Sequence, residues 1–183
     1  MALGAVLAVA PVSAGTPADA GARITAILAA SGPTSTGIQM MNTTVTGCQF
    51  VVAFDAIENG DPLSGQLTGN LTDISGDAIT LRPNETDQDL FFELPGPLPE
   101  WTITAVAPVG TELFTTLSTD PAALPYVAAD CNETQCDLIF DIGGGWDTYT
   151  MNVDLTEVVS RPDADLLLVA FRDLAGLCND RAE

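Results

Sequence analysis

Two of the cationic residue types are missing from this chain of 183 residues, which contains neither lysine nor histidine. Without histidine, a Ser-His-Asp triad or a Cys-His pair cannot form, and no metal ion can be held through imidazole. Without lysine, the chain has no Schiff-base residue for pyridoxal phosphate and no P-loop lysine for a nucleotide. These absences exclude most nucleophilic and cofactor-dependent mechanisms.

Positive charge of any kind is scarce. The chain has 5 arginines and 25 acidic residues, which gives a net charge of -20. A field of this sign repels phosphate groups, so we expect neither a nucleic-acid partner nor binding to an anionic lipid surface. The simplest interpretation is a solvated anionic surface that keeps the protein soluble. The functional alternatives are binding of a divalent cation and docking to a cationic partner.

No apolar run is long enough to cross a membrane as a helix. The run Met1 to Ala10 is too short to span a bilayer. Pro11 follows it, and the small residues before Gly15 resemble a signal-peptidase site, although the usual basic flank is missing. We therefore expect residues 1–14 to be a partial signal peptide, with no transmembrane segment in the mature chain. The expected location is periplasmic or extracellular.

The 4 cysteines support export. An even number of cysteines in an exported chain predicts two disulfides, with three alternative pairings. Cys131 and Cys136 flank a short loop, so we expect them to bond to each other, which leaves Cys48 to pair with Cys178. A zinc site of four thiolates is the competing interpretation, but the cysteine spacing fits it poorly.

The segment 15–37 is small and polar, and we expect it to be flexible or partly helical. Ile24, Ile27 and Leu28 recur at helical spacing, which predicts a helix at about 21–30 that ends at Gly32-Pro33. Residues 38–183 then form a single β-rich domain, because their apolar residues recur with a period of two.

About ten short strands, separated by turn residues, predict an antiparallel β-sandwich of the immunoglobulin-like or jelly-roll-like kind. A closed β-barrel is the alternative. The run 166–171 is apolar on both faces and is interpreted as a central strand, followed by a helical turn at 173–178. The other expected strands are 48–55, 67–74, 79–82, 90–94, 101–105, 112–117, 126–129, 138–140 and 148–155.

Carboxylates provide the only acid–base chemistry that the composition leaves. Two acidic groups separated by about 5–10 Å can hydrolyse a glycosidic bond. The sequence does not single out one pair. The carboxylates on expected strands or at their ends are Asp55, Glu58, Glu93, Asp141 and Asp154.

Calcium is the most specific ligand that the sequence suggests. This hard cation takes six to eight oxygen ligands, which loop carboxylates, amides and carbonyls can supply. Solvated turns are the alternative, since Asp and Asn are common there. The candidate ligands are Asp87 and Asp89 in the segment 84–89, Asp130 and Asp137 around the loop between the cysteines, and the pair Asp163 and Asp165.

Exposed aromatic rings often form a stacking platform for sugars. Trp146 lies beside a glycine-rich turn and Tyr149 follows closely, so these two side chains are the candidate platform. Trp101 begins an alternating strand and is expected in the core.

The sequence therefore predicts an exported, acidic, non-catalytic β-domain with a binding or structural role at the cell envelope or outside the cell. Calcium is its expected stabilising ion, and a carbohydrate or a protein is its expected partner. The alternative is a carboxylate-dependent hydrolase that acts on carbohydrate.

Overall fold

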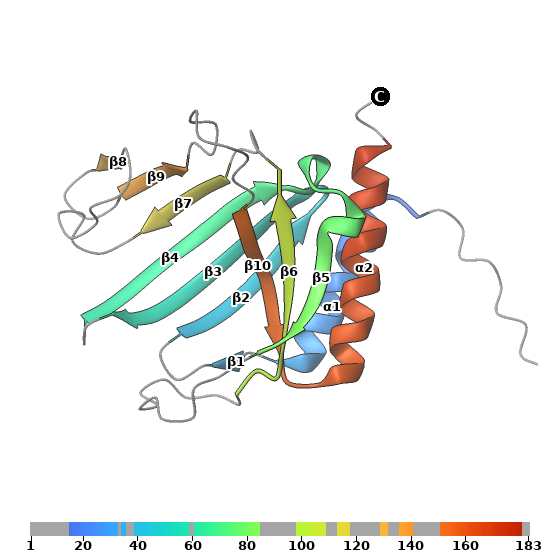
Figure 1. Cartoon of the computed structure of the whole chain (residues 1–183), viewed down its shortest axis with the longest axis horizontal. Helices are drawn as coiled ribbons and strands as arrows, with labels where there is room; N and C mark the ends of the chain where they lie inside the picture. Colours follow the sequence, from blue (N-terminus) through green and yellow to red (C-terminus); the bar gives the residue numbers. More distant parts are fainter. Residues whose placement is uncertain are drawn as a thin grey trace, which may run out of the picture.

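Two antiparallel sheets and two long helices make up the computed structural model of the chain (Figure 1). The structure describes residues 15–32, 34–35, 39–58, 61–84, 98–108, 113–117, 129–131, 136–140 and 151–180. Within these ranges the fold is mainly β and antiparallel, as the sequence predicts. Neither sheet closes on itself, because the described strand orders run from β1 to β8 and from β10 to β5 without returning.

The larger sheet has seven strands in the order β1-β2-β3-β4-β7-β9-β8. Residues of β3 alternate as the period of two predicts, so Phe50 and Val52 are buried. Gly47 has a φ of +60°, which the tight turn between β2 and β3 requires and which favours glycine. The strands are β1 (Thr34–Ser35), β2 (Gln39–Thr46), β3 (Gln49–Glu58), β4 (Asp61–Asn70), β7 (Leu113–Leu117), β8 (Ala129–Cys131) and β9 (Cys136–Phe140).

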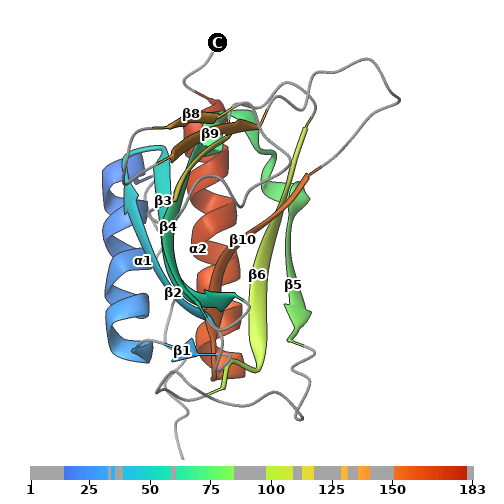
Figure 2. The ribbon, with the colours of Figure 1, turned by 90° about the vertical axis from the view of Figure 1, so that its left-hand side faces the viewer.

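The smaller sheet has three strands in the order β10-β6-β5, formed by β10 (Met151–Val158), β6 (Trp101–Ala107) and β5 (Ile79–Pro83). One face contributes Ile103, Ala105 and Val153 to the core. Strand β10 also crosses the larger sheet, where the Thr43 hydroxyl of β2 donates a hydrogen bond to the Leu155 carbonyl. Figure 2 shows the two sheets as separate layers, with α2 beside them.

The run 166–171 is not a strand, which corrects the sequence prediction. It lies in helix α2 (Arg161–Asn179), which also contains the helical turn expected at 173–178. Leu167, Ala170 and Phe171 are buried at helical spacing, whereas Leu166 and Val169 are 57% and 54% exposed. The apolar run is therefore one-sided in a helix. Ser160 begins the helix by accepting a hydrogen bond from the Asp163 amide at 3.4 Å, a capping signal that the strand interpretation overlooked.

The expected N-terminal helix is present and longer than predicted, as α1 (Pro17–Ser31). Thr16 and Asp19 form a capping box, and Gly32 ends the helix. The helix packs against α2 and the edge of β2, where a side chain at Gly21 would contact Val45. Among the described residues, strand β1 pairs with only Met40 and Met41 of β2, so α1 lies beside the part of β2 that β1 leaves uncovered and limits the exposed hydrogen-bonding groups that promote aggregation.

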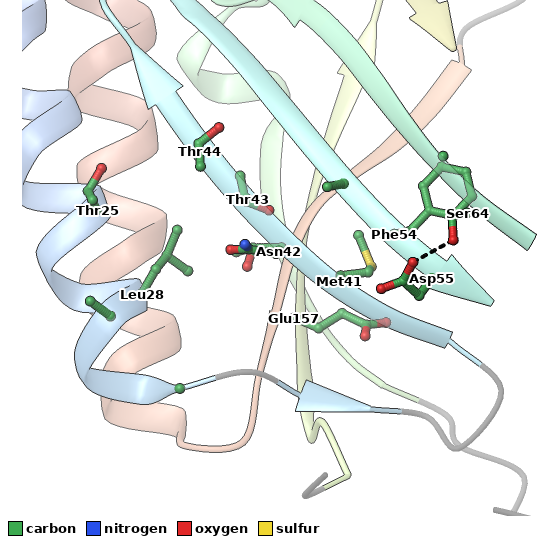
Figure 3. Close-up of a pocket in the computed structure, with 15 residues that line it drawn as sticks. Thr25, Leu28, Met41, Asn42, Thr43, Thr44, Phe54, Asp55, Ser64 and Glu157 are labelled. Carbon is green, nitrogen blue, oxygen red and sulfur yellow. Dashed lines mark hydrogen bonds between the residues drawn. The ribbon is translucent and has the colours of Figure 1, made fainter. Parts of the chain in front are cut away.

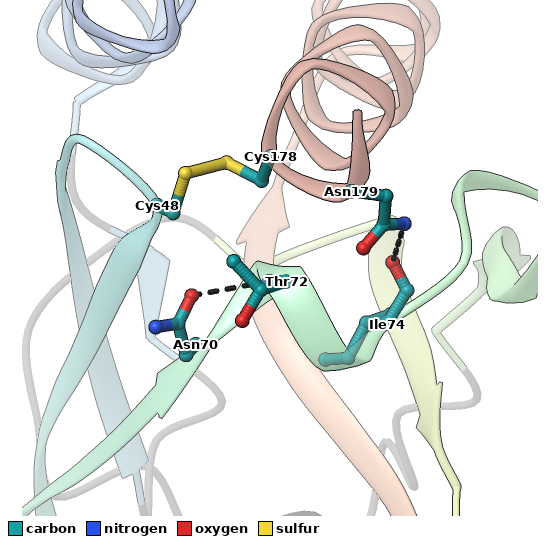
Figure 4. Close-up of a disulfide and its surroundings, with 6 residues drawn as sticks. All are labelled: Cys48, Asn70, Thr72, Ile74, Cys178 and Asn179. Carbon is teal, nitrogen blue, oxygen red and sulfur yellow. Dashed lines mark hydrogen bonds between the residues drawn. A yellow bond between two sulfur atoms is a disulfide. The ribbon is translucent and has the colours of Figure 1, made fainter. Parts of the chain in front are cut away.

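A disulfide joins Cys48, in the turn after β2, to Cys178, near the end of α2, with 5.7 Å between their Cα atoms (Figure 4). This pairing is the long one expected from the sequence. Close by, the Asn179 amide donates to the Ile74 carbonyl at 3.2 Å, just after the short helix η1 (Leu71–Asp73). The end of α2 is thus fixed to the turn between β2 and β3 and to the connection between β4 and β5. Helix α2 also packs on the short helix η2 (Gly76–Ala78) in that connection.

Candidate functional site

A pocket of about 600 Å³ lies around the edge of β2 (Figure 3). Helix α1 contributes Thr25, Leu28 and Ala29 to its wall. Strands β2, β3 and β4 contribute residues 41–44, 53–55 and 64–65, and β10 contributes Thr156 and Glu157. Elements that are far apart in the sequence therefore meet here, and the wall is a mixture of hydroxyl, amide, carboxylate and apolar groups.

Asp55 is the exposed carboxylate of the pocket. It lies directly opposite Ser64 in the β3–β4 ladder, and the Ser64 hydroxyl donates a hydrogen bond to Asp55 Oδ1 at 2.7 Å. This cross-strand bond orients the Asp55 side chain, while its exposure leaves the carboxylate accessible from solvent. Figure 3 shows the pair on β3 and β4, beside Met41 and Phe54.

Glu157 is the half-buried carboxylate of the pocket. Its Oε1 accepts a hydrogen bond from the Asn84 side-chain amide at 3.2 Å. Its Oε2 is buried and has no hydrogen-bond partner among the described residues. Burial and the negative charge of Asp154 raise the pKa of Glu157 above its usual value near 4.5, while Asn84 and Arg82 act in the opposite direction.

Asp154 lies near Glu157, but both of its carboxylate oxygens accept hydrogen bonds from neighbouring side chains. The Arg82 guanidinium donates to both Asp154 oxygens through Nη2, at 3.1 and 2.9 Å. Thr104 links the two side chains, because its hydroxyl donates to Asp154 at 2.9 Å and accepts from Arg82 Nε at 3.1 Å. This row crosses β5, β6 and β10, so it braces the small sheet and holds Arg82 in place.

The described arginines are all engaged, and none of them lines the pocket. Arg23 pairs with Asp173 at 2.6 Å, and Arg172 donates to the Ile79 carbonyl at 2.9 Å. Arg161 pairs with Asp165 and lies 4.4 Å from the centre of the Trp101 ring. Trp101 itself is only half-buried. The charge that the described residues bring to the pocket wall is therefore negative.

Of the two predicted carboxylates whose side chains the structure describes, Asp55 lines this pocket and Asp154 does not. Asp154 is in the ion pair with Arg82. The backbone of Glu58 ends β3, and its side chain lies outside the described part, as do Glu93 and Asp141. Glu157 was not among the residues predicted from the sequence.

Of the candidate calcium ligands, the structure places only Asp130 and Asp137 opposite each other among the described residues. Asp87 and Asp89 lie outside the described part of the chain, and only the backbone of Asp130 and Asp137 is described. These two residues are direct neighbours across β8 and β9. In the third cluster, the Asp163 amide donates to the Ser160 hydroxyl that caps α2, and Asp165 pairs with Arg161. Within the described ranges, no group of three or more metal-binding side chains occurs.

The structure describes only some of the remaining predicted site residues. Trp146 and Tyr149, the candidate sugar platform, lie outside the described residues, as does the signal-like segment 1–14. Cys131 and Cys136 are direct partners in the β8–β9 ladder. Directly paired residues have Cα atoms about 4.5–5.5 Å apart, which suits a disulfide. The short disulfide therefore stays a prediction that this strand register favours.

No protein-family model, curated protein or solved structure matches the chain. Among the described helices, none combines the length and the apolar character needed to cross a bilayer.

Proposed function

We propose that the protein is a non-catalytic binding domain that works in an oxidising compartment, periplasmic or extracellular, and takes a small polar ligand in the pocket around β2. The observation that carries this proposal is the pocket itself, with a volume of about 600 Å³. Ligand pockets of drug-sized molecules measure about 300–1,000 Å³ and combine apolar walls with a few polar groups. The Cys48–Cys178 disulfide supports the compartment, because structural disulfides are rare in reducing cytosol.

The two pocket walls formed by α1 and β10 are held in place by contacts with the rest of the fold. Helix α1 is held through its buried Ile24 and through its packing on α2, and α2 is held by the disulfide. Strand β10 is held by the Arg82–Asp154 ion pair and by its contact with Thr43. A pocket whose walls are fixed before the ligand arrives loses less entropy on binding.

Two tryptophan substitutions on α1 test the proposal. Ala29 and Ala26 are both exposed on this helix, but only Ala29 lines the pocket. In a thermal-shift screen against neutral oligosaccharides and small amines, Ala29→Trp should abolish the response of the bound compound because the indole fills the pocket. Ala26→Trp should leave it intact. A response that survives Ala29→Trp, or a screen without any response, would contradict the proposal.

A carbohydrate hydrolase is the second candidate function, because two carboxylates in different surroundings line the same pocket. Glu157 is half-buried with a raised pKa, as a general acid requires, while Asp55 is exposed and hydrogen-bonded. Incubation with nitrophenyl glycosides and oligosaccharides tests this alternative. Turnover that Glu157→Gln abolishes would establish it in place of the non-catalytic proposal.

Calcium stabilisation is retained as a proposal for the β8–β9 hairpin. Like charges directly opposite each other destabilise a sheet, and Asp130 faces Asp137 in register. A cation bound between them would remove that repulsion. Titration calorimetry with calcium should give a saturable heat that Asp130→Asn reduces; a flat titration would exclude this site.

A further inference from the structure

The charge of the pocket wall is one-sided. Asp55 and Glu157 both line it, and none of the described arginines does. The whole chain carries a net charge of -20, which adds a negative field over the opening. An anionic ligand is disfavoured by both contributions, whereas a cationic ligand is attracted by both.

Glu157 brings to the pocket a negative charge that has no ion-pair partner among the described residues. The Asn84 amide engages Oε1, but Oε2 is buried with no partner among the described residues. The nearest cation, Arg82, is directed at Asp154 through both of its Nη2 hydrogen bonds. Because Oε2 is buried, a ligand does not reach it directly, but the charge of Glu157 is costly to bury, so a cation in the pocket would stabilise it through space.

We propose that the pocket binds a small organic cation, whose primary ammonium group is attracted by Glu157 and whose second amino group is attracted by Asp55. This inference rests on the proposed binding function and names its ligand class. An ammonium group carries three donors and a full charge, so its hydrogen bond to a carboxylate is charge-assisted.

Other ligand classes fit the same wall less well. A bare calcium ion takes six to eight oxygens, and no group of three acidic side chains occurs among the described residues of the site. A neutral sugar would supply hydroxyl donors but would leave the charge of Glu157 unpaired. The raised pKa of Glu157 agrees with a cationic ligand, because burial and the neighbouring charge of Asp154 disfavour the ionised carboxylate, which a cation in the pocket would stabilise.

Titration calorimetry with spermidine, and with maltotriose as the neutral probe, tests the inference on the full chain. Glu157→Gln removes the charge while keeping an oxygen for Asn84, and it should weaken spermidine binding about tenfold or more. Asp55→Asn, at an exposed position, should weaken it by a smaller factor. Glu100→Gln is the matched control, since Glu100 is exposed, near the end of β10, and outside the pocket wall. It should change the affinity less than twofold (about 0.4 kcal/mol).

The outcomes separate this inference from the proposed function. Spermidine binding that Glu157→Gln and Ala29→Trp weaken, but Glu100→Gln does not, supports both. Absent spermidine binding, or equal weakening by Glu157→Gln and Glu100→Gln, overturns the organic-cation inference. Maltotriose binding that is lost in Ala29→Trp and kept in Glu157→Gln also overturns it, while sustaining the binding pocket. If Ala29→Trp leaves the affinity for either probe unchanged, the pocket is not the binding site and the proposed function is refuted. If Glu157→Gln does not fold, Asp55→Asn decides between these results.

Discussion

The disulfide between Cys48 and Cys178 joins the β2–β3 turn to the end of α2, and removing it tests quantitatively how much the cross-link stabilises the fold. The two residues are 130 positions apart in the sequence. A cross-link that closes a loop of this length lowers the entropy of the unfolded chain by an amount worth about 5 kcal/mol. Because small domains have total stabilities of about 5–15 kcal/mol, the double variant Cys48→Ala, Cys178→Ala should lose a third or more of its stability.

The packing around Cys178 indicates that the loss of unfolding free energy is no smaller than the entropy of the cross-link predicts. Cys178 is fully buried, and the neighbouring Asn179 donates to the Ile74 carbonyl, so the last turn of α2 is packed as well as cross-linked. Alanine at position 178 leaves the space of a sulfur atom, which adds to the entropic cost. The direction of both effects is the same.

Equilibrium unfolding in urea, followed by circular dichroism and extrapolated linearly, measures the loss. The matched control is Cys131→Ala, Cys136→Ala, which removes the proposed short disulfide; its loop of a few residues predicts a loss of only about 2 kcal/mol. A loss below about 1 kcal/mol in the long-loop variant, or one no larger than in the short-loop variant, would refute the loop-entropy explanation.

Two further predictions concern the core and the pocket. Phe171→Ala should cost about 3–5 kcal/mol in urea unfolding, because the ring is fully buried where α2 meets the core, whereas the exposed Val169→Ala should cost little; equal losses would contradict the helical assignment. Because the pKa of Glu157 is raised in the folded state, its favourable contribution is present below pH 4.5 and is lost as the pH rises through the raised value. Wild type should therefore lose stability relative to Glu157→Gln as the pH rises above 4.5 in pH-dependent unfolding, and parallel curves would exclude the assigned burial.

Strand β3 and helix α1 were predictable because their buried residues follow simple periods, whereas β2 was not among the expected strands and the strand expected at 67–74 ends at Asn70, just before η1. In β3, Phe50 and Val52 alternate with more exposed residues, and α1 has its capping box and terminal glycine in sequence. The prediction for the run 166–171 failed because six apolar residues fit a buried strand and a helix equally well. Only the burial of Leu167 and Phe171, against the exposure of Leu166, distinguishes the two.

The pocket could not be predicted for a topological reason. It forms where α1, β2 and β10 meet, and no local pattern brings Ala29, Asn42 and Glu157 together. The register of β10 also shifts between Asp154 and Thr156. A strict period of two would place Glu157 on the same face as Val153 and Leu155, but this β-bulge turns it toward the polar face, opposite Thr102.

A chemical-shift titration of the labelled protein with spermidine locates the ligand without any substitution, and so tests directly whether the pocket is the binding site. We expect saturable shifts concentrated at the residues that line the pocket, which are Thr25, Leu28, Ala29, Gly32, 41–44, 53–55, 64–65 and 156–157. Shifts spread over the exposed acidic residues of α2, such as Asp165 and Asp173, with none at the pocket, would contradict the proposed site. A spectrum in which no resonance moves at saturating spermidine would contradict it equally.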